Sequence, residues 1–194
     1  MAKLTLVHAP MSRSEMMRVI LEELGAEYEL REVTITRRGG AGSEDPNNPH
    51  PHKQVPALIH NDCVIWEQSA IAIYLSELYP DSPLVRAPGD AERGPFLSWI
   101  SWYAATFEHA LIAKFDDVIE GDQGKKRMYE RVCSLLDRQL TAHDYLMGDA
   151  PVIPDFFLAG ALNFVRDLLP TSNVLDAYSV RMDRPIARRL RAEG

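Results

Sequence analysis

The chain has 194 residues, of which 46% are hydrophobic and 25% charged, a composition typical of a globular protein with one large or two small domains. Its formal net charge of −7 argues against binding to nucleic acid or to an anionic membrane surface. No run of about 18 apolar residues occurs, and residues 1–4 lead directly into a strand-like segment without a signal peptide, so we expect a cytoplasmic protein.

The chain has two cysteines, Cys63 and Cys133, which lie in dissimilar contexts and lack CxxC or metal-ligand spacing. This pattern argues against a disulfide framework or a zinc site, and we expect both to be ordinary buried or half-buried thiols. His50, His52 and His60 have no carboxylate or cysteine partner at ligand spacing, so no metal is expected.

The N-terminal segment has the pattern of a β-α-β unit. Residues 4–7 form a short apolar run that is typical of a buried strand, and residues 28–33 alternate like a second strand. Between them, one helical face carries Met17, Ile20, Leu21 and Leu24. Ser12 or Ser14 is the expected N-cap and Gly25 the expected residue after the helix. The order predicts a parallel strand pair joined by a right-handed crossover.

The segment from residue 51 to residue 80 is expected to form a strand, a turn, a second strand and a helix. Residues 57–60 and 63–66 are the two strands, and Asn61-Asp62 between them tolerates the positive φ of a tight hairpin. From Gln68 the apolar spacing becomes helical, at Ile71, Tyr74, Leu75 and Leu78, until Pro80 ends the pattern. Residues 37–52, rich in Gly, Pro and Asn, read as an irregular loop.

Two features of this segment indicate ligand binding. Gln68-Ser69 stands at the start of a helix, where backbone N–H groups and partial positive charge favour a carboxylate. Val55-Pro56 opens a strand, and because proline donates nothing to the ladder, the Val55 backbone groups are available to an extended peptide.

These residues resemble the glutathione transferase family, bacterial-type, with a serine-containing active-site loop. Its members carry a cis-proline after valine or isoleucine and a Glu/Gln-Ser pair at the next helix start, matched here by Val55-Pro56 and Gln68-Ser69. The resemblance implies an α/β thioredoxin-like glutathione-binding domain in residues 1–82 and an all-α C-terminal domain in residues 90–194. It implies glutathione as co-substrate, a homodimer, and an active site in the cleft between the domains.

By the same resemblance, the loop before the first helix holds the catalytic hydroxyl. Alignment on Arg18-Val19 favours Ser14, Ser12 is the competitor, and Arg13 between them is placed to contact the anionic ligand. The alternative is that one serine is an N-cap and the other is merely exposed. Such a hydroxyl and the helix N-terminus would stabilise the thiolate, which is the nucleophilic form.

The resemblance also places the glycine carboxylate of glutathione at Lys53, or at Gln54 as second choice; the alternative is a solvated loop lysine. Trp66 is expected in the core rather than at a ligand. Residues 81–89, rich in Pro, Gly and Asp, are the expected linker.

Beyond the linker the periodicity is helical. An aromatic stripe typical of core runs through Phe96, Trp99, Ile100, Tyr103 and Phe107. A second long helix is expected to end near Gly148, and a buried one to span 156–169. Asp155 is interpreted as a structural residue at that helix start.

The predicted function is a glutathione S-transferase that ionises glutathione for attack on a small electrophile, whose pocket is placed at residues such as Phe107, Ala110 and Leu111. Glutathione-dependent isomerisation and disulfide or peroxide reduction use the same thiolate and are alternatives. A non-catalytic binding or assembly protein of the same fold is the alternative from another class.

Overall fold

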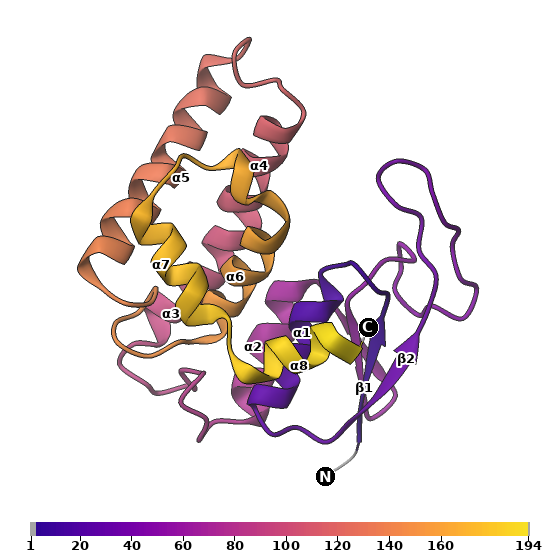
Figure 1. Ribbon diagram of the computed structural model, residues 1–194. Helices are drawn as coiled ribbons and strands as arrows, with labels where there is room; N and C mark the ends of the chain where they lie inside the picture. The colour runs from indigo at the N-terminus through magenta and orange to yellow at the C-terminus, as the bar shows by residue number, and fades with distance from the viewer. Residues whose placement is uncertain (1–2, 194) are drawn as a thin grey trace. The chain divides into compact units, whose positions relative to one another are not determined.

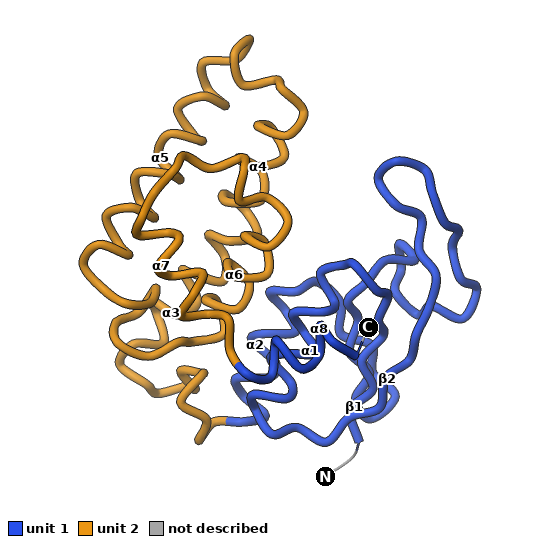
Figure 2. Tube along the Cα trace, viewed as in Figure 1, with its two compact units in different colours: residues 1–79, 185–194 blue, residues 80–184 orange. Residues whose placement is uncertain are grey.

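The computed structural model describes residues 3–193 and contains two compact units (Figure 2). The first unit contains the chain through Tyr79 together with the segment from Pro185 onward, and the second unit runs from Pro80 to Arg184. The chain therefore returns to its first unit at the end, whereas the sequence assigned the whole C-terminal part to the helical domain.

The first unit is built on a four-stranded sheet in the order β2-β1-β3-β4 (Figure 1). The strands are β1 (Leu4–His8), β2 (Tyr28–Glu32), β3 (Ala57–His60) and β4 (Cys63–Trp66). β1 pairs in parallel with β2, while β1–β3 and β3–β4 are antiparallel, so the expected parallel pair and hairpin are confirmed. Asn61 and Asp62 have φ of 49° and 64°, as a tight hairpin turn requires.

The helices of the first unit are α1 (Ser14–Glu23), α2 (Gln68–Leu78) and α8 (Pro185–Glu193). α1 packs on β1, α2 packs on β3 and β4, and α8 packs on α1 (Figure 1). The predicted core face of α1 is confirmed by the buried Met17, Ile20 and Leu21. Gly25, at φ 67°, follows the helix as expected, but the predicted serine N-cap is wrong, because Arg13 occupies that position without a side-chain cap.

The segment between β2 and β3 contains neither helix nor strand among its described residues, which confirms the expected irregular loop. It is ordered by its own hydrogen bonds. The fully buried Asn48 donates from Nδ2 to the Gln54 carbonyl at 3.1 Å and accepts the His50 N–H at 3.0 Å. Such a buried amide holds a loop because its polar atoms are paired within the chain.

The second unit is helical throughout. Its elements are α3 (Arg93–Trp102), the π-helical turn η1 (Tyr103–Phe107), α4 (Glu108–Phe115), α5 (Gln123–Ala142), α6 (Ile153–Val165), the 3₁₀ turn η2 (Arg166–Leu168) and α7 (Asn173–Met182). α5 ends before the expected Gly148, because His143 is already extended, at φ −141°. Within residues 3–193, no helix combines the length and the apolar character needed to cross a membrane.

The predicted aromatic stripe and the predicted buried helix form the core of the second unit. Phe96, Ile100, Tyr103 and Phe107 are buried, and α6 is buried along its first seven residues. Ala110 and Leu111 are buried as well, with exposed fractions of 0% and 4%. Phe107 is likewise buried, at 1% exposed, and the place of these three residues in the wall of an electrophile pocket stays a prediction.

Asp155 has the structural role that was expected of it. Its carboxylate is fully buried and accepts the Val152 N–H at 2.9 Å, the Leu146 N–H at 2.9 Å and the Tyr178 hydroxyl at 3.0 Å. These bonds join the start of α6 to the preceding loop and to α7.

Candidate functional site

The register of the sheet gathers three segments of the first unit at one edge. Val7 pairs with Ala57, and Ala57 pairs with Trp66. The residues that follow β1, precede β3 and follow β4 therefore lie at the same end of the sheet, and α1 and α2 both begin there. Two helix N-termini at one edge concentrate free N–H groups and partial positive charge, which suits an anionic ligand.

The loop between β1 and α1 contains two hydrogen-bonded serines. Ser14 is fully buried, and its Oγ accepts the Ala9 N–H at 3.1 Å and lies 2.8 Å from His8 Nδ1. Ser12 is half-buried, and its Oγ lies 2.7 Å from Ser14 Oγ and donates to the Ala9 carbonyl at 2.7 Å. Of the two predicted hydroxyls, Ser12 is the one that solvent reaches.

His8 is a buried polar residue that sequence reasoning missed. Burial, and secondarily the nearby positive charge of Arg18, lower its pKa to about 4, so the ring is neutral at physiological pH. The available signal was a histidine between the apolar run of β1 and the serine loop.

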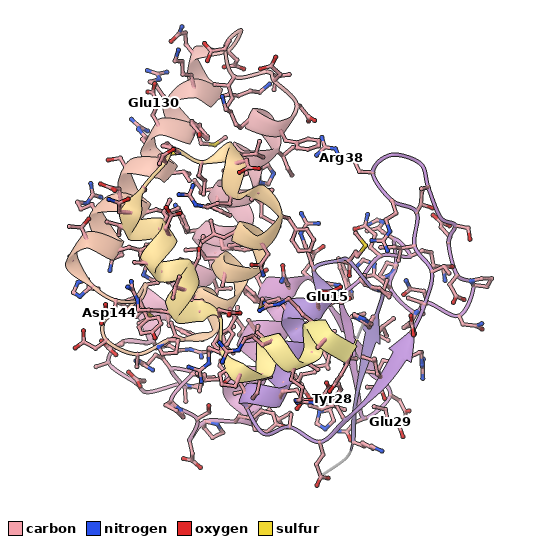
Figure 3. The ribbon with its side chains drawn as sticks, in the orientation of Figure 1. Glu15, Tyr28, Glu29, Arg38, Glu130 and Asp144 are labelled. Carbon is pink, nitrogen blue, oxygen red and sulfur yellow. The ribbon has the colours of Figure 1, made fainter. Side chains whose placement is uncertain are left out.

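Arg37 fixes the backbone of the serine loop from the β2–β3 segment. Its Nη1 donates to the Met11 carbonyl at 2.8 Å, and its Nη2 donates to the Pro10 carbonyl at 2.6 Å. On the other side, the Glu15 carboxylate, labelled in Figure 3, accepts the Met11 N–H. Met11 has φ 52° and is exposed, so these contacts hold a strained turn. Arg13 lies exposed directly before α1.

The Val55-Pro56 bond is cis, as the resemblance implies. Pro56 is buried, Val55 is half-buried, and the pairing with β1 begins only at Ala57. Outside the sheet ladder, the described structure contains no backbone partner for the Val55 N–H or C=O. An extended ligand therefore has an edge to pair with at this point.

The start of α2 presents both acceptors and donors. Gln68 begins the helix and is 9% exposed, and its Oε1 is buried without a hydrogen-bond donor within the described residues. An orphaned buried acceptor is rare and costs free energy unless a ligand or water supplies the donor. Ser69 is half-buried beside it.

Sequence reasoning also missed Glu67, which precedes α2 at φ 70° and is exposed. A positive φ is uncommon for a residue with a long side chain and marks a constrained turn. The acidic residue immediately before a helix start was the available signal.

The structure places Lys53 and Gln54 directly before this edge, but in different surroundings. The Lys53 ammonium donates to the Asn48 carbonyl at 2.7 Å and to the Pro46 carbonyl at 3.2 Å. It therefore closes the loop rather than extending into solvent. Gln54 is exposed.

Two expectations about the hairpin are wrong. Trp66 is 40% exposed and packs edge-on against His50 and His52, with ring centroids 5.7 Å and 6.4 Å away, so it is not a core residue. Cys63 is exposed rather than buried, whereas Cys133 is half-buried as expected.

Among residues 3–193, no three His, Cys, Asp or Glu side chains form a group that would hold a metal ion.

Comparison with known proteins shows consistent similarity. The family model for the N-terminal domain of glutathione S-transferases matches residues 2–77. A dichloromethane dehalogenase of Methylophilus leisingeri is 30% identical over 79% of this chain, but the chain spans only 62% of that relative's length. Glutathione S-transferase D7 of Drosophila melanogaster is 26% identical over 85% of this chain and 76% of its own. A sphingomonad glutathione S-transferase, solved in complex with glutathione, superposes with a TM-score of 0.79 at 25% identity, covering 98% of both chains.

Proposed function

Since the chain belongs to the glutathione S-transferase family, we propose that it binds glutathione at the edge of the sheet and ionises its thiol for attack on a small electrophile. The proposal assigns each part of the tripeptide to groups of the first unit that have the matching chemistry.

The start of α2 carries the proposal, because it supplies both halves of a site for an α-amino acid group. The free N–H groups of Gln68 and Ser69 would bind the γ-glutamyl carboxylate. The Glu67 carboxylate and the orphaned Gln68 Oε1 would accept from the adjacent ammonium. The middle of the tripeptide would pair with the Val55 backbone in extended form.

The glycine carboxylate would lie near Lys53 and Gln54, at the end of the same extended path. Because the Lys53 ammonium already donates to two carbonyl groups, its third N–H and its charge are what remain for the ligand. The exposed Gln54 amide is the second donor.

Ser12 is the hydroxyl that we place against the sulfur, and Ser14 supports it. Lowering a thiol pKa by about two units requires about 2.7 kcal/mol of preferential thiolate stabilisation. A hydrogen bond from Ser12 together with the partial positive charge of the α1 N-terminus is of that order. Ser14 is fully buried, so its contribution would pass through its 2.7 Å contact with Ser12. Arg13, exposed before α1, would add positive charge toward the ligand.

The similarity to a dichloromethane dehalogenase suggests a halogenated one-carbon compound as the first electrophile to assay. In that reaction the thiolate sulfur would form a bond to carbon, the carbon–halogen bond would break, and the halide would leave with the electron pair.

We also propose a homodimer, for which the exposed Trp66 and Cys63 of β4 are candidate contact residues.

The test is glutathione binding to the purified protein by calorimetry, with the absorbance of the bound thiolate followed against pH. We expect micromolar to millimolar affinity and a thiol pKa clearly below the ordinary value near 8.5. Cysteinylglycine, which lacks the γ-glutamyl group, should bind at least tenfold more weakly. Sedimentation velocity on the same sample checks the dimer.

Ser12→Ala and Ser14→Ala form the matched pair for the catalytic step. Ser12→Ala should raise the bound thiol pKa and reduce turnover much more than it reduces glutathione affinity, in a protein with parental stability. Ser14→Ala should also lower stability, because it leaves the buried Ala9 N–H without its acceptor. Parental turnover in Ser12→Ala would reject the assignment of Ser12. Absence of glutathione binding at millimolar concentration would reject the enzymatic function and favour a binding or assembly role.

A further inference from the structure

His8 ends the hydrogen-bonded chain that begins at Ser12. Its Nδ1 lies 2.8 Å from Ser14 Oγ, which in turn lies 2.7 Å from Ser12 Oγ. We propose that His8 is a positioning residue: with its proton on Nδ1, it orients the Ser14 and Ser12 hydroxyl protons toward the thiolate of bound glutathione. This inference rests on the proposed function and adds a residue to it.

The hydrogen bonds of Ser14 determine the direction of the chain. A hydroxyl has one proton and two lone pairs, and one lone pair of Ser14 accepts the Ala9 N–H at 3.1 Å. If His8 Nδ1 carries a proton, it fills the second lone pair, so Ser14 has only its own proton left to give. The shortest acceptor for that proton is Ser12 Oγ at 2.7 Å, since the Ala9 carbonyl is 3.2 Å away.

Ser12 is then left with only its proton to offer. Its oxygen accepts the Ser14 hydroxyl and also the Ser14 N–H at 3.1 Å, which occupies both lone pairs. Without ligand, the Ser12 proton goes to the Ala9 carbonyl at 2.7 Å. A thiolate carries charge and is a stronger acceptor than this carbonyl. Hydrogen bonds aligned in one direction also polarise one another, which makes Ser12 a better donor.

The other tautomer of His8 removes this bias. Nδ1 without a proton accepts from Ser14, so one lone pair of Ser14 Oγ is open to the Ser12 hydroxyl at 2.7 Å. The Ser12 proton would then be divided among Ser14, the Ala9 carbonyl and the thiolate. The protonated Nδ1 is therefore the tautomer that favours donation to an ionised ligand.

The charge of His8 stays constant in this arrangement, and only its tautomer changes. The ring is buried, and burial together with the positive Arg18 of α1 holds its pKa near 4. Glu32 of β2 is the register partner of His8 in the sheet and is exposed. The ring thus stays neutral between pH 5 and 9, and only the position of its single proton changes.

Two substitutions distinguish the effect of losing the His8 hydrogen bond from the effect of losing the imidazole ring. His8→Leu removes the donor, whereas His8→Asn keeps an amide nitrogen at nearly the position of Nδ1. We expect His8→Leu to raise the pKa of the bound glutathione thiol by about one unit, from about 6.5 to about 7.5, which is about a fivefold loss of thiolate at pH 6.5. At saturating glutathione, the kcat/KM of His8→Leu for the electrophile should fall about fivefold at that pH and approach the parental value at high pH, while His8→Asn stays within about twofold.

A merely structural role would change glutathione affinity or the melting temperature without moving the thiol pKa. A parental thiol pKa in folded His8→Leu with bound glutathione would therefore overturn the role of His8 and leave the proposed function intact. A parent protein that fails to bind glutathione would overturn both.

Nitrogen NMR of the parent protein tests the same point without any substitution, and so does not depend on the folding of His8→Leu. With saturating glutathione at a pH above its bound thiol pKa, the His8 ring should show a protonated Nδ1 and an unprotonated Nε2. The opposite tautomer would overturn the proposal.

Discussion

Replacement of Asp155 by alanine should be strongly destabilising, because the carboxylate joins three parts of the helical unit. Removing it leaves the buried Leu146 N–H and Val152 N–H without acceptors, while the Tyr178 hydroxyl keeps the Asp155 backbone carbonyl at 3.0 Å. Each buried donor left unpaired costs about 1–3 kcal/mol. We therefore expect Asp155→Ala to lower the free energy of unfolding by about 3 kcal/mol at pH 7.

The pH dependence of this effect follows from the pKa of Asp155. Burial raises it from 3.8 to about 6, although the hydrogen bonds from Val152, Leu146 and Tyr178 act in the opposite direction. The folded state therefore holds a proton that the unfolded state releases between pH 4 and pH 6. Parental stability consequently falls as pH rises through this window, by up to about 3 kcal/mol. Asp155→Ala lacks this dependence, so its deficit should be larger at pH 4 than at pH 7.

The assay is urea unfolding followed by circular dichroism at both pH values. Asp176→Ala is the matched control, because Asp176 pairs with Arg166 at 2.7 Å but is exposed on the surface of α7. Exposed ion pairs contribute about 0–1 kcal/mol, so this variant should stay close to the parent. Equal effects of the two substitutions would contradict the argument from burial. A deficit of Asp155→Ala that grows from pH 4 to pH 7 would contradict the direction of the pKa shift.

Two further outcomes follow from the loop between β2 and β3. Arg37→Ala removes the two hydrogen bonds to the serine loop and should lower kcat/KM with glutathione about tenfold. The control is Arg38→Ala, which should have little effect; Arg38 is the next residue, is exposed, and is labelled in Figure 3. Gly42→Ala should destabilise the protein by at least about 2 kcal/mol in urea unfolding, because a Cβ there would lie 2.2 Å from the Ile35 carbonyl oxygen. Gly40, at a similar φ of 80°, has open space around it, so Gly40→Ala should cost only about 1 kcal/mol.

The parts of the fold that were predictable from the sequence are those set by local periodicity and turn chemistry. The hairpin followed from two apolar runs around Asn61-Asp62, and the start of α2 followed from the change of period at Gln68. The end of α5 was not predictable in this way, because the sequence between Ala142 and Gly148 has no strong helix breaker.

Long-range packing explains most of what the sequence did not reveal. α8 has a helical pattern, but nothing in that pattern says that it packs on α1, where Arg189 pairs with Glu22 at 2.8 Å. Trp66 was expected in the core because large aromatic residues are usually buried. Its exposure depends on the edge position of β4, which only the strand order fixes.

The segments of the candidate site were predictable from the sequence, but the separate roles of its residues were not. The family resemblance grouped Ser12, Ser14, Val55 and Gln68 in one candidate site, and the register of the sheet brings their segments to one edge. Spacing in the sequence cannot distinguish Ser12 from Ser14. The two serines are only two residues apart at the start of a helix, so their positions do not show which of them is buried.

The difference between the two serines arises from what surrounds each oxygen. Ser14 lies at the first position of α1, where its oxygen accepts the Ala9 N–H and contacts the neutral ring of His8. Burial of a hydroxyl is tolerated because all of its hydrogen-bonding capacity is used. Ser12 lies just outside the helix, and its hydroxyl donates to the Ala9 carbonyl at 2.7 Å. A ligand can compete for that proton without breaking any bond of Ser14. The loop thus separates a hydroxyl that maintains the turn from one that is able to change its partner, and only the second is suited to meet a developing negative charge.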